Sequence, residues 1–281
     1  MSDVTVRSGD AEIAVETFGD ANDPPVLLVM GVMASMLWWP EEFCKTLAAR
    51  GRFVIRYDNR DTGRSTAWPM GAPTYSFADM ADDAVSILDA LDIPAAHVVG
   101  MSMGGMIAQR IAVRHPERLL TLTVISSSPL GISDLPSPTE SYLKHAESGE
   151  AVDWSNRSDV VDFIVRECRA LAGTAHPHDA AAARDLIERD FDRARSFASA
   201  TNHFLLAGGE DGPEPRAADI RSAVLVIHGT NDPLFPLAHG EAFADALPTA
   251  RLLPIEGGGH ELHKNDWPVI IDAVVAHTAA Q

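Results

Sequence analysis

Cysteine is scarce in this sequence. Only two of the 281 residues are cysteines, Cys44 and Cys168, and neither has another cysteine or a histidine at the spacing of metal ligands. Disulfide-stabilised folds need several cysteine pairs, and most structural zinc sites need clusters of cysteine and histidine. We therefore expect no disulfide framework, no metal site and no catalytic cysteine, and we expect a reducing compartment.

Long apolar runs and positive charge are also lacking. No apolar stretch reaches the ~18–20 residues that cross a bilayer, and the N-terminal segment has no apolar core typical of a signal peptide. The formal net charge is -18, whereas nucleic acids and anionic membrane surfaces attract basic proteins. These absences favour a cytoplasmic protein that binds neither nucleic acid nor a membrane.

What the sequence does have is a regular alternation of apolar runs and amphipathic segments. Continuous apolar runs are typical of strands buried in a parallel sheet, and apolar residues three and four apart indicate helices. The alternation predicts a doubly wound, mostly parallel sheet of eight strands, the first two forming a hairpin. The expected strands are 5–7, 13–18, 26–30, 53–57, 97–100, 120–126, 223–228 and 250–255, and the expected helices are 41–50, 77–91, 103–115, 239–247 and 267–278.

The alternation breaks between residues 129 and 218. This stretch opens with a Ser/Pro-rich segment and closes with a Gly/Pro/acidic one, and helical patterns without a convincing strand lie between them. We predict an α/β core made of residues 1–128 and 219–281, and a helical cap made of residues 129–218. A flexible loop with ordinary crossover helices is the alternative.

A serine between two glycines stands where an apolar strand meets an apolar helix, in Gly100-Met101-Ser102-Met103-Gly104. A nucleophile on a sharp strand-to-helix turn has a strained backbone and projects above the sheet. Bulky residues two positions away would collide with the backbone, so glycine fits there. We predict Ser102 as the nucleophile. A tight turn with an incidental serine is the alternative.

A serine hydroxyl needs a base, and the base needs an orienting acid. His260 follows the strand 250–255 and a run of three glycines, and Asp232 follows the strand 223–228. Both positions are at the carboxyl ends of strands, where chemistry belongs in an open α/β sheet. We predict His260 as base and Asp232 as acid. His263 is the nearest rival base, and a simple Asx turn is the alternative for Asp232.

Two backbone N–H groups are candidates for an oxyanion hole. One belongs to Met103, directly after the nucleophile, and the other to Val32, in the loop that follows the strand 26–30. Gly31 lets that loop turn inward. We predict that the N–H groups of Val32 and Met103 bind the oxyanion.

Several segments resemble known motifs. YDNRDTGRS at 57–65 resembles the Asp-x-Arg-x-x-Gly-x-Ser segment of the α/β-hydrolase superfamily, and MGGM at 103–106 and HPER at 115–118 match its common pattern. LLVMGVMASMLWWPEEF, VIRYDNRDTGRST and AHVVGMSMGG resemble the methylesterases that trim anthracycline polyketides, of the aclacinomycin methylesterase type. The resemblance implies a helical cap over the site. The chain departs from the pattern at Met30, where many members have histidine, and at Val32, where the methylesterases tend to have glycine.

Together these features predict a carboxylic-ester hydrolase that works through an acyl-enzyme without metal or organic cofactor. We expect its substrates to be small to medium apolar esters, with methyl esters of polyketide-like compounds among them. Lactone hydrolysis, cofactor-free perhydrolysis and carbon–carbon hydrolysis use the same triad and stay open, as do a non-catalytic small-molecule-binding protein and a homodimer. The expected pocket walls are Met33, Trp38 or Trp39, the neighbourhood of Met101, and cap residues such as Phe163 or Phe204.

Overall fold

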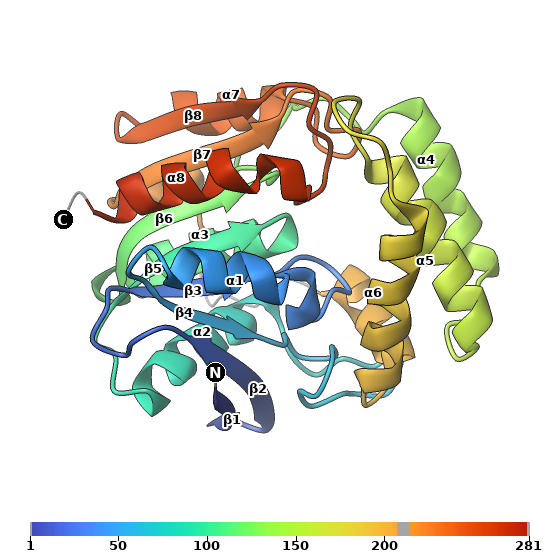
Figure 1. Ribbon diagram of the computed structural model, residues 1–281, viewed down its shortest axis with the longest axis horizontal. Helices are drawn as coiled ribbons and strands as arrows, with labels where there is room; N and C mark the ends of the chain where they lie inside the picture. The colour runs from blue at the N-terminus through green and yellow to red at the C-terminus, as the bar shows by residue number, and fades with distance from the viewer. Residues whose placement is uncertain (1, 207–213, 280–281) are drawn as a thin grey trace.

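An eight-stranded sheet forms the centre of the protein, as a computed structural model that describes residues 2–206 and 214–279 shows (Figure 1). The strand order is β1-β2-β4-β3-β5-β6-β7-β8, and every pair from β4 to β8 is parallel. β1 and β2 form the predicted hairpin, and β2 pairs antiparallel with β4. The fold class expected from the sequence is confirmed. The strands are β1 (Ser2–Ser8), β2 (Ala11–Phe18), β3 (Pro25–Val29), β4 (Phe53–Tyr57), β5 (Ala96–Met101), β6 (Leu119–Ile125), β7 (Ala223–Gly229) and β8 (Ala250–Ile255).

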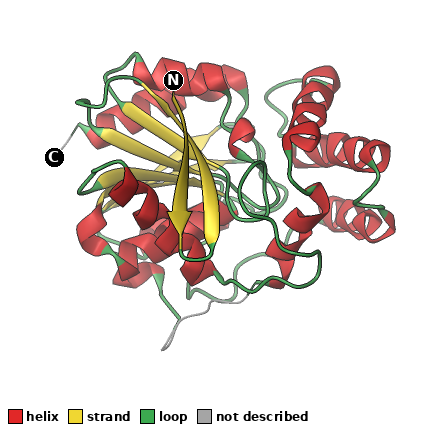
Figure 2. Ribbon diagram, turned by 90° about the horizontal axis from the view of Figure 1, so that it is seen from below, coloured by secondary structure: helices red, strands yellow, loops and turns green. Residues whose placement is uncertain are grey.

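Helices cover both faces of this sheet (Figure 2). Alternate residues of a strand point to opposite faces, and in β3 Leu27 packs with one group of helices whereas Leu28 packs with the other. This explains why the central strands read as continuous apolar runs: both of their faces are buried. The first group is α2 (Phe77–Ala90), α3 (Met103–Arg114) and α7 (Ala238–Asp245), and the second is α1 (Glu41–Ala48) and α8 (Trp267–Thr278).

Three further helices lie between β6 and β7, together with 3-10 segments of which Phe197–Leu205 is the longest, and the helices stand together beside the sheet (Figures 1 and 2). Asn156 and Asp179 cap the two longer helices through their side chains, as expected of N-cap residues. These elements have a small apolar cluster of their own, against which Met33 and Trp38 of the core pack. The elements are α4 (Glu140–Glu147), α5 (Arg157–Leu171), α6 (Ala180–Arg193) and the 3-10 segment Phe197–Leu205.

We use the word cap only as a label for the described residues within 129–218, the range predicted from the sequence. The Gly/Pro/acidic segment expected to close it lies partly at 207–213, outside the described residues. Polar contacts of the largely buried Asp190 and Arg193 join α6 to the core. The indole N–H of Trp38 donates to Asp190 at 2.7 Å, and Arg193 forms an ion pair with Asp58, also at 2.7 Å.

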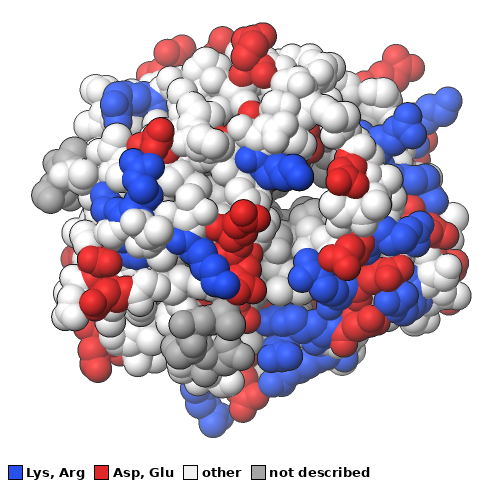
Figure 3. Space-filling model, viewed as in Figure 1, with Lys and Arg blue, Asp and Glu red and all other residues white. Residues whose placement is uncertain are grey.

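The outer surface of the cap has many charges of both signs. Figure 3 shows lysine or arginine and aspartate or glutamate side chains next to one another over the side of α5 and α6. Arg157 pairs with Asp192 at 2.7 Å, and Arg184 pairs with Asp162 at 2.6 Å, and all four side chains are exposed. The excess of acidic residues therefore does not make this face uniformly negative. In the described part of the chain no helix is both long and apolar enough to cross a membrane.

Candidate active site

Ser102 lies at the sharp turn between β5 and α3. Its backbone has φ 55° and ψ -123°, a conformation that residues with a side chain seldom adopt. Only glycine fits on either side of the turn. A Cβ on Gly100 would lie 2.3 Å from the oxygen of Gly104, and a Cβ on Gly104 would lie 2.2 Å from the oxygen of Val29. The two glycines of the motif are therefore required by close backbone packing.

Hydrogen bonds from β6 and the loop after it hold this turn. The N–H of Ser102 donates to the carbonyl of Ile125 at 2.9 Å, and the hydroxyl of Ser127 donates to the carbonyl of Ser102 at 2.8 Å. Within the described residues the hydroxyl of Ser102 has no hydrogen-bond partner of its own. Ser127 was not recognised from the sequence, because a run of three serines gives no sign of which one faces the turn.

His260 and Asp232 are in direct contact. The Nδ1 atom of His260 lies 2.8 Å from Oδ2 of Asp232, and the pair is buried. The other oxygen of Asp232 accepts the N–H groups of Leu234 and Phe235, at 2.9 and 2.8 Å. One oxygen of Asp232 thus makes the Asx turn, and the other contacts the imidazole. The turn fixes the direction in which the carboxylate points.

The surroundings keep Asp232 ionised. Burial acts to raise the pKa of the carboxyl, but the charge of His260 and the hydrogen bonds from His260 and Phe235 outweigh it. The pKa of Asp232 therefore lies below its ordinary value. A carboxylate only accepts hydrogen bonds, so Nδ1 carries the hydrogen in this contact, and Nε2 is the ring atom that can exchange a proton with the site.

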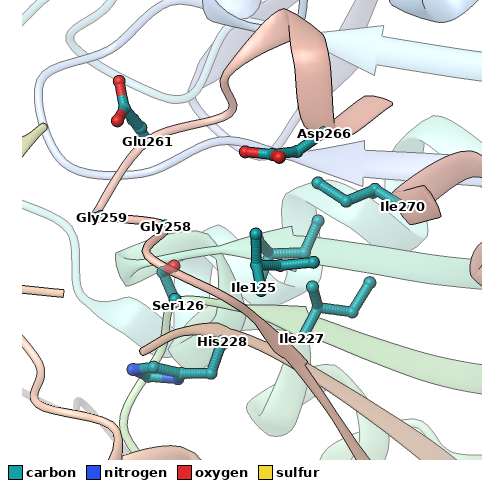
Figure 4. A pocket seen from close by; sticks show the side chains of 11 residues that line it. Ile125, Ser126, Ile227, His228, Gly258, Gly259, Glu261, Asp266 and Ile270 are labelled. Atoms are coloured by element: carbon teal, nitrogen blue, oxygen red, sulfur yellow. The ribbon is translucent and has the colours of Figure 1, made fainter. Parts of the chain in front are cut away.

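The loop that carries His260 contacts the cap. The backbone N–H of His260 donates to the carbonyl of Leu171 at 2.8 Å, and the ring of Phe235 lies edge-on at 5.5 Å. On the side of α8 the same loop borders a pocket, whose lining includes Gly258, Gly259 and Ile270 (Figure 4). The Nε2 atom of His260 makes no hydrogen bond among the described residues. Catalytic hydrogen bonds are often loose before substrate binds.

The rival base His263 and the neighbouring His228, whose Nε2 lies 3.7 Å from Asp232, make their main contacts elsewhere. His228 is fully buried, and its Nε2 donates to the carbonyl of Phe235 at 2.7 Å. His263 stacks on His176 of the cap, with ring centroids 4.3 Å apart, and Nε2 of His176 is 2.8 Å from Oδ1 of Asp266. Within the described ranges this trio could present atoms to a metal ion, since its candidate ligand atoms lie within 4.8 Å of one another.

The loop after β3 lies directly against the serine. A Cβ on Gly31 would be 3.1 Å from Cβ of Ser102, a tight contact, so glycine at position 31 lets the loop lie against the serine without displacing it. Among the described residues the N–H of Val32 has no acceptor. Met103 is the first residue of α3, and the first N–H groups of a helix have no partner within it. Two N–H groups, those of Val32 and Met103, thus lie near the Ser102 turn, one in the loop after β3 and one at the start of α3.

Side chains of the 57–65 motif support this loop. Asn59 donates to the carbonyl of Met30 at 2.9 Å, and Asp58 accepts the N–H of Met36 at 2.9 Å.

Among the predicted pocket walls, Trp39 is wrong: it is completely buried and packs on Phe43 with ring centroids 5.7 Å apart. The structure also places Phe163 in the cluster of the cap and leaves Phe204 67% exposed.

Comparisons with known proteins find the same family that the sequence motifs resemble. The model of a family described as alpha/beta hydrolase fold matches residues 24–266. The chain is 35% identical to rhodomycin D methylesterase DauP of Streptomyces sp. (strain C5), over 94% of each chain. It is 34% identical to rhodomycin D methylesterase DnrP of Streptomyces peucetius, over 98% of this chain and 97% of the relative. A crystal structure of the esterase RhEst1 from Rhodococcus sp. ECU1013 superposes with a TM-score of 0.81 at 20% identity, over 100% of this chain and 99% of that one.

Proposed function

The chain belongs to the α/β-hydrolase fold family and is a hydrolase of the esterase type, and we propose that it cleaves carboxylic esters with Ser102 as nucleophile, His260 as base and Asp232 as orienting acid. The single observation that carries the proposal is the 2.8 Å contact between His260, in the loop after β8, and Asp232, in the loop after β7, at the same edge of the parallel sheet as the strained turn of Ser102 after β5. This contact supports an imidazole whose Nδ1 is held by the carboxylate and whose Nε2 is left to exchange protons with Ser102 and the substrate.

Each step uses a group in this site. The oxygen of Ser102 forms a bond to the ester carbonyl carbon while its proton moves to Nε2 of His260. The carbonyl electron pair becomes an oxyanion, which the N–H groups of Val32 and Met103 stabilise. The electron pair then re-forms the carbonyl, the bond to the alkoxide breaks, and His260 gives its proton to the leaving alcohol. Water, deprotonated by His260, releases the acid from the acyl-enzyme by the same sequence.

The cap is proposed to cover the substrate. Its apolar cluster packs on Met33 and Trp38, beside the loop of the proposed oxyanion hole. Figure 3 shows the surface hollowed between the sheet side of the molecule and the cap helices. An apolar cover of this kind favours esters with an apolar body. The identity to two rhodomycin D methylesterases supports a methyl ester of a polycyclic polyketide as substrate.

Labelling with a fluorophosphonate probe tests the nucleophile. We expect stoichiometric labelling of the wild type and none of Ser102→Ala, which should also lose hydrolysis of p-nitrophenyl acetate. Ser86→Ala is the matched control, because Ser86 lies on α2 and contacts Ser8 at the N-terminal hairpin. Equal labelling of Ser102→Ala and the wild type would show that another residue is the nucleophile.

A substrate panel tests the second part of the proposal. It compares rhodomycin D, aromatic methyl esters, short p-nitrophenyl esters and lactones at equal enzyme concentration. We expect the highest kcat/KM for the polycyclic methyl ester. A preference for lactones would move the proposal to the alternative reaction of the same triad, without changing the role of Ser102.

A further inference from the structure

His203 connects the cap to the loop that carries Val32. It lies in the 3-10 segment after α6 and is 3% exposed. Its Nδ1 atom is 3.0 Å from the backbone nitrogen of Met33, and its Nε2 atom is 2.8 Å from the backbone oxygen of Arg60. Both ring nitrogens are therefore in contact with backbone groups of the core, which come from two different loops.

These two partners fix the tautomer of the ring. A carbonyl oxygen only accepts, so Nε2 must carry a hydrogen that it donates to Arg60. A backbone N–H only donates, so Nδ1 must be unprotonated to accept from Met33. Burial lowers the pKa of His203, although the contact with Arg60 and the charge of Asp61 act in the other direction. The ring is thus neutral, as the contact with Met33 requires.

The peptide group that carries the Val32 N–H lies between two peptide groups that side chains hold. In the preceding peptide group the carbonyl of Met30 accepts from Asn59 at 2.9 Å. In the following one the N–H of Met33 donates to His203. Because each peptide group is planar, holding both neighbours leaves the group between them little freedom to rotate.

The backbone at Met33 needs this support. Its φ is 60°, in the left-handed region that costs a residue with a side chain about 1–2 kcal/mol. The hydrogen bond to His203 helps to keep Met33 in this conformation. If the backbone of Met33 changed conformation, the neighbouring peptide group of Val32 would rotate with it. On its other side, Gly31 lies against Ser102, which limits how far the loop could shift to compensate.

We propose that His203 is a positioning residue for the oxyanion hole: by accepting the N–H of Met33 it aims the N–H of Val32 at the oxygen that becomes negative when Ser102 attacks. The inference rests on the proposed function. It also makes the geometry of the hole depend on the last segment of the cap, since His203 belongs to Phe197–Leu205.

Two amide substitutions separate the two contacts of the ring. The amide of His203→Asn can reach the place of Nδ1 and accept from Met33, but it is too short to reach Arg60. The amide of His203→Gln can reach the place of Nε2 and donate to Arg60, but it leaves the Met33 N–H without an acceptor. His97→Asn is the matched control, a buried histidine whose Nδ1 contacts Thr121 at the other end of β5.

The readout is inhibition by an aryl trifluoromethyl ketone. The hydroxyl of Ser102 adds to this ketone, its proton passes to His260, and the carbonyl electron pair becomes an oxyanion in the hole. We expect His203→Gln to weaken inhibition and to lower kcat by about 10- to 100-fold each, less than the loss of a whole oxyanion donor, with KM nearly unchanged. His203→Asn and His97→Asn should stay within a few-fold of the wild type.

Several outcomes would overturn the inference. Equal inhibition of the wild type and His203→Gln would do so, and so would a loss that His203→Asn shares in full. If His203→Gln does not fold, the nitrogen chemical shifts of the wild-type ring decide, because a hydrogen on Nδ1 of His203 contradicts the proposal. Failure of the ketone to bind the wild type would instead count against the proposed function, which Ser102→Ala tests separately.

Discussion

Replacing Asp190 by asparagine should stabilise the protein at neutral pH. Asp190 lies on α6, is 1% exposed and accepts the indole N–H of Trp38 at 2.7 Å. Burial raises the pKa of Asp190 from 3.8 to about 6; the nearby charge of Asp58 adds to this effect, and hydrogen bonds from Ser35 and Trp38 offset only part of it. Asparagine removes the buried charge and keeps one oxygen for Trp38, but its NH2 group cannot accept from Ser35, so the gain from losing the charge is an upper limit.

The magnitude follows from the two pKa values of Asp190. They differ by about 2, and a difference of one corresponds to about 1.4 kcal/mol, so the ionised carboxylate costs the folded state about 3 kcal/mol at pH 7. Between about pH 4 and pH 6 the folded protein keeps a proton that the unfolded chain has lost. This group therefore makes the free energy of unfolding fall as the pH rises through that window, and its effect is constant above it.

Urea unfolding at pH 7 and at about pH 4 measures this effect. Asp190→Asn should gain up to about 3 kcal/mol at pH 7 and much less at the lower pH. The matched control is Asp192→Asn, on the same helix but exposed and paired with Arg157, where a change below about 1 kcal/mol is expected. A variant at Asp190 that is less stable than the wild type at pH 7, or equally stabilised at both pH values, would refute the reasoning.

Two further substitutions test the turn and the acid. Asp232→Asn removes the charge that holds the tautomer of His260, so kcat should fall by about 10⁴ while the midpoint of thermal unfolding changes little; a loss below about tenfold would contradict the assigned acid. Gly104→Ala places a methyl group 2.2 Å from the oxygen of Val29, so we expect little soluble, active protein. Gly9→Ala, where nothing lies within 4 Å and φ is +54°, should cost only about 1 kcal/mol by urea unfolding, and equal behaviour of the two variants would count against close packing at the turn.

Local signals explain which parts of the fold could be predicted. Strands such as β3 read as unbroken apolar runs because both faces of the sheet are covered, and helices such as α2 begin at an ordinary cap, here Ser76. The Ser102 turn was predictable because its requirements are also local. Gly100 must be glycine because it packs on Gly104, four residues away, and Gly104 must be glycine because it packs on Val29 of the adjacent strand.

Contacts between distant parts of the chain explain what the sequence could not show. His203 meets Met33 across 170 residues and Asp190 meets Trp38 across 152, so no local pattern marks either of them. The same holds for the choice between neighbouring tryptophans. Trp38 turns to the cap and Trp39 to the core, which depends on the 3-10 turn Met36–Trp38 that periodicity does not reveal.

The most direct test of the account is to trap the acyl-enzyme. The wild type is mixed with excess p-nitrophenyl acetate, quenched in acid during turnover, digested, and analysed by mass spectrometry. We predict a single acetyl group on the peptide that contains Ser102, formed as fast as the first p-nitrophenol is released, and none after Ser102→Ala. Continued turnover without acetyl on Ser102, or an acetyl group that forms just as fast on another residue, would contradict the central claim.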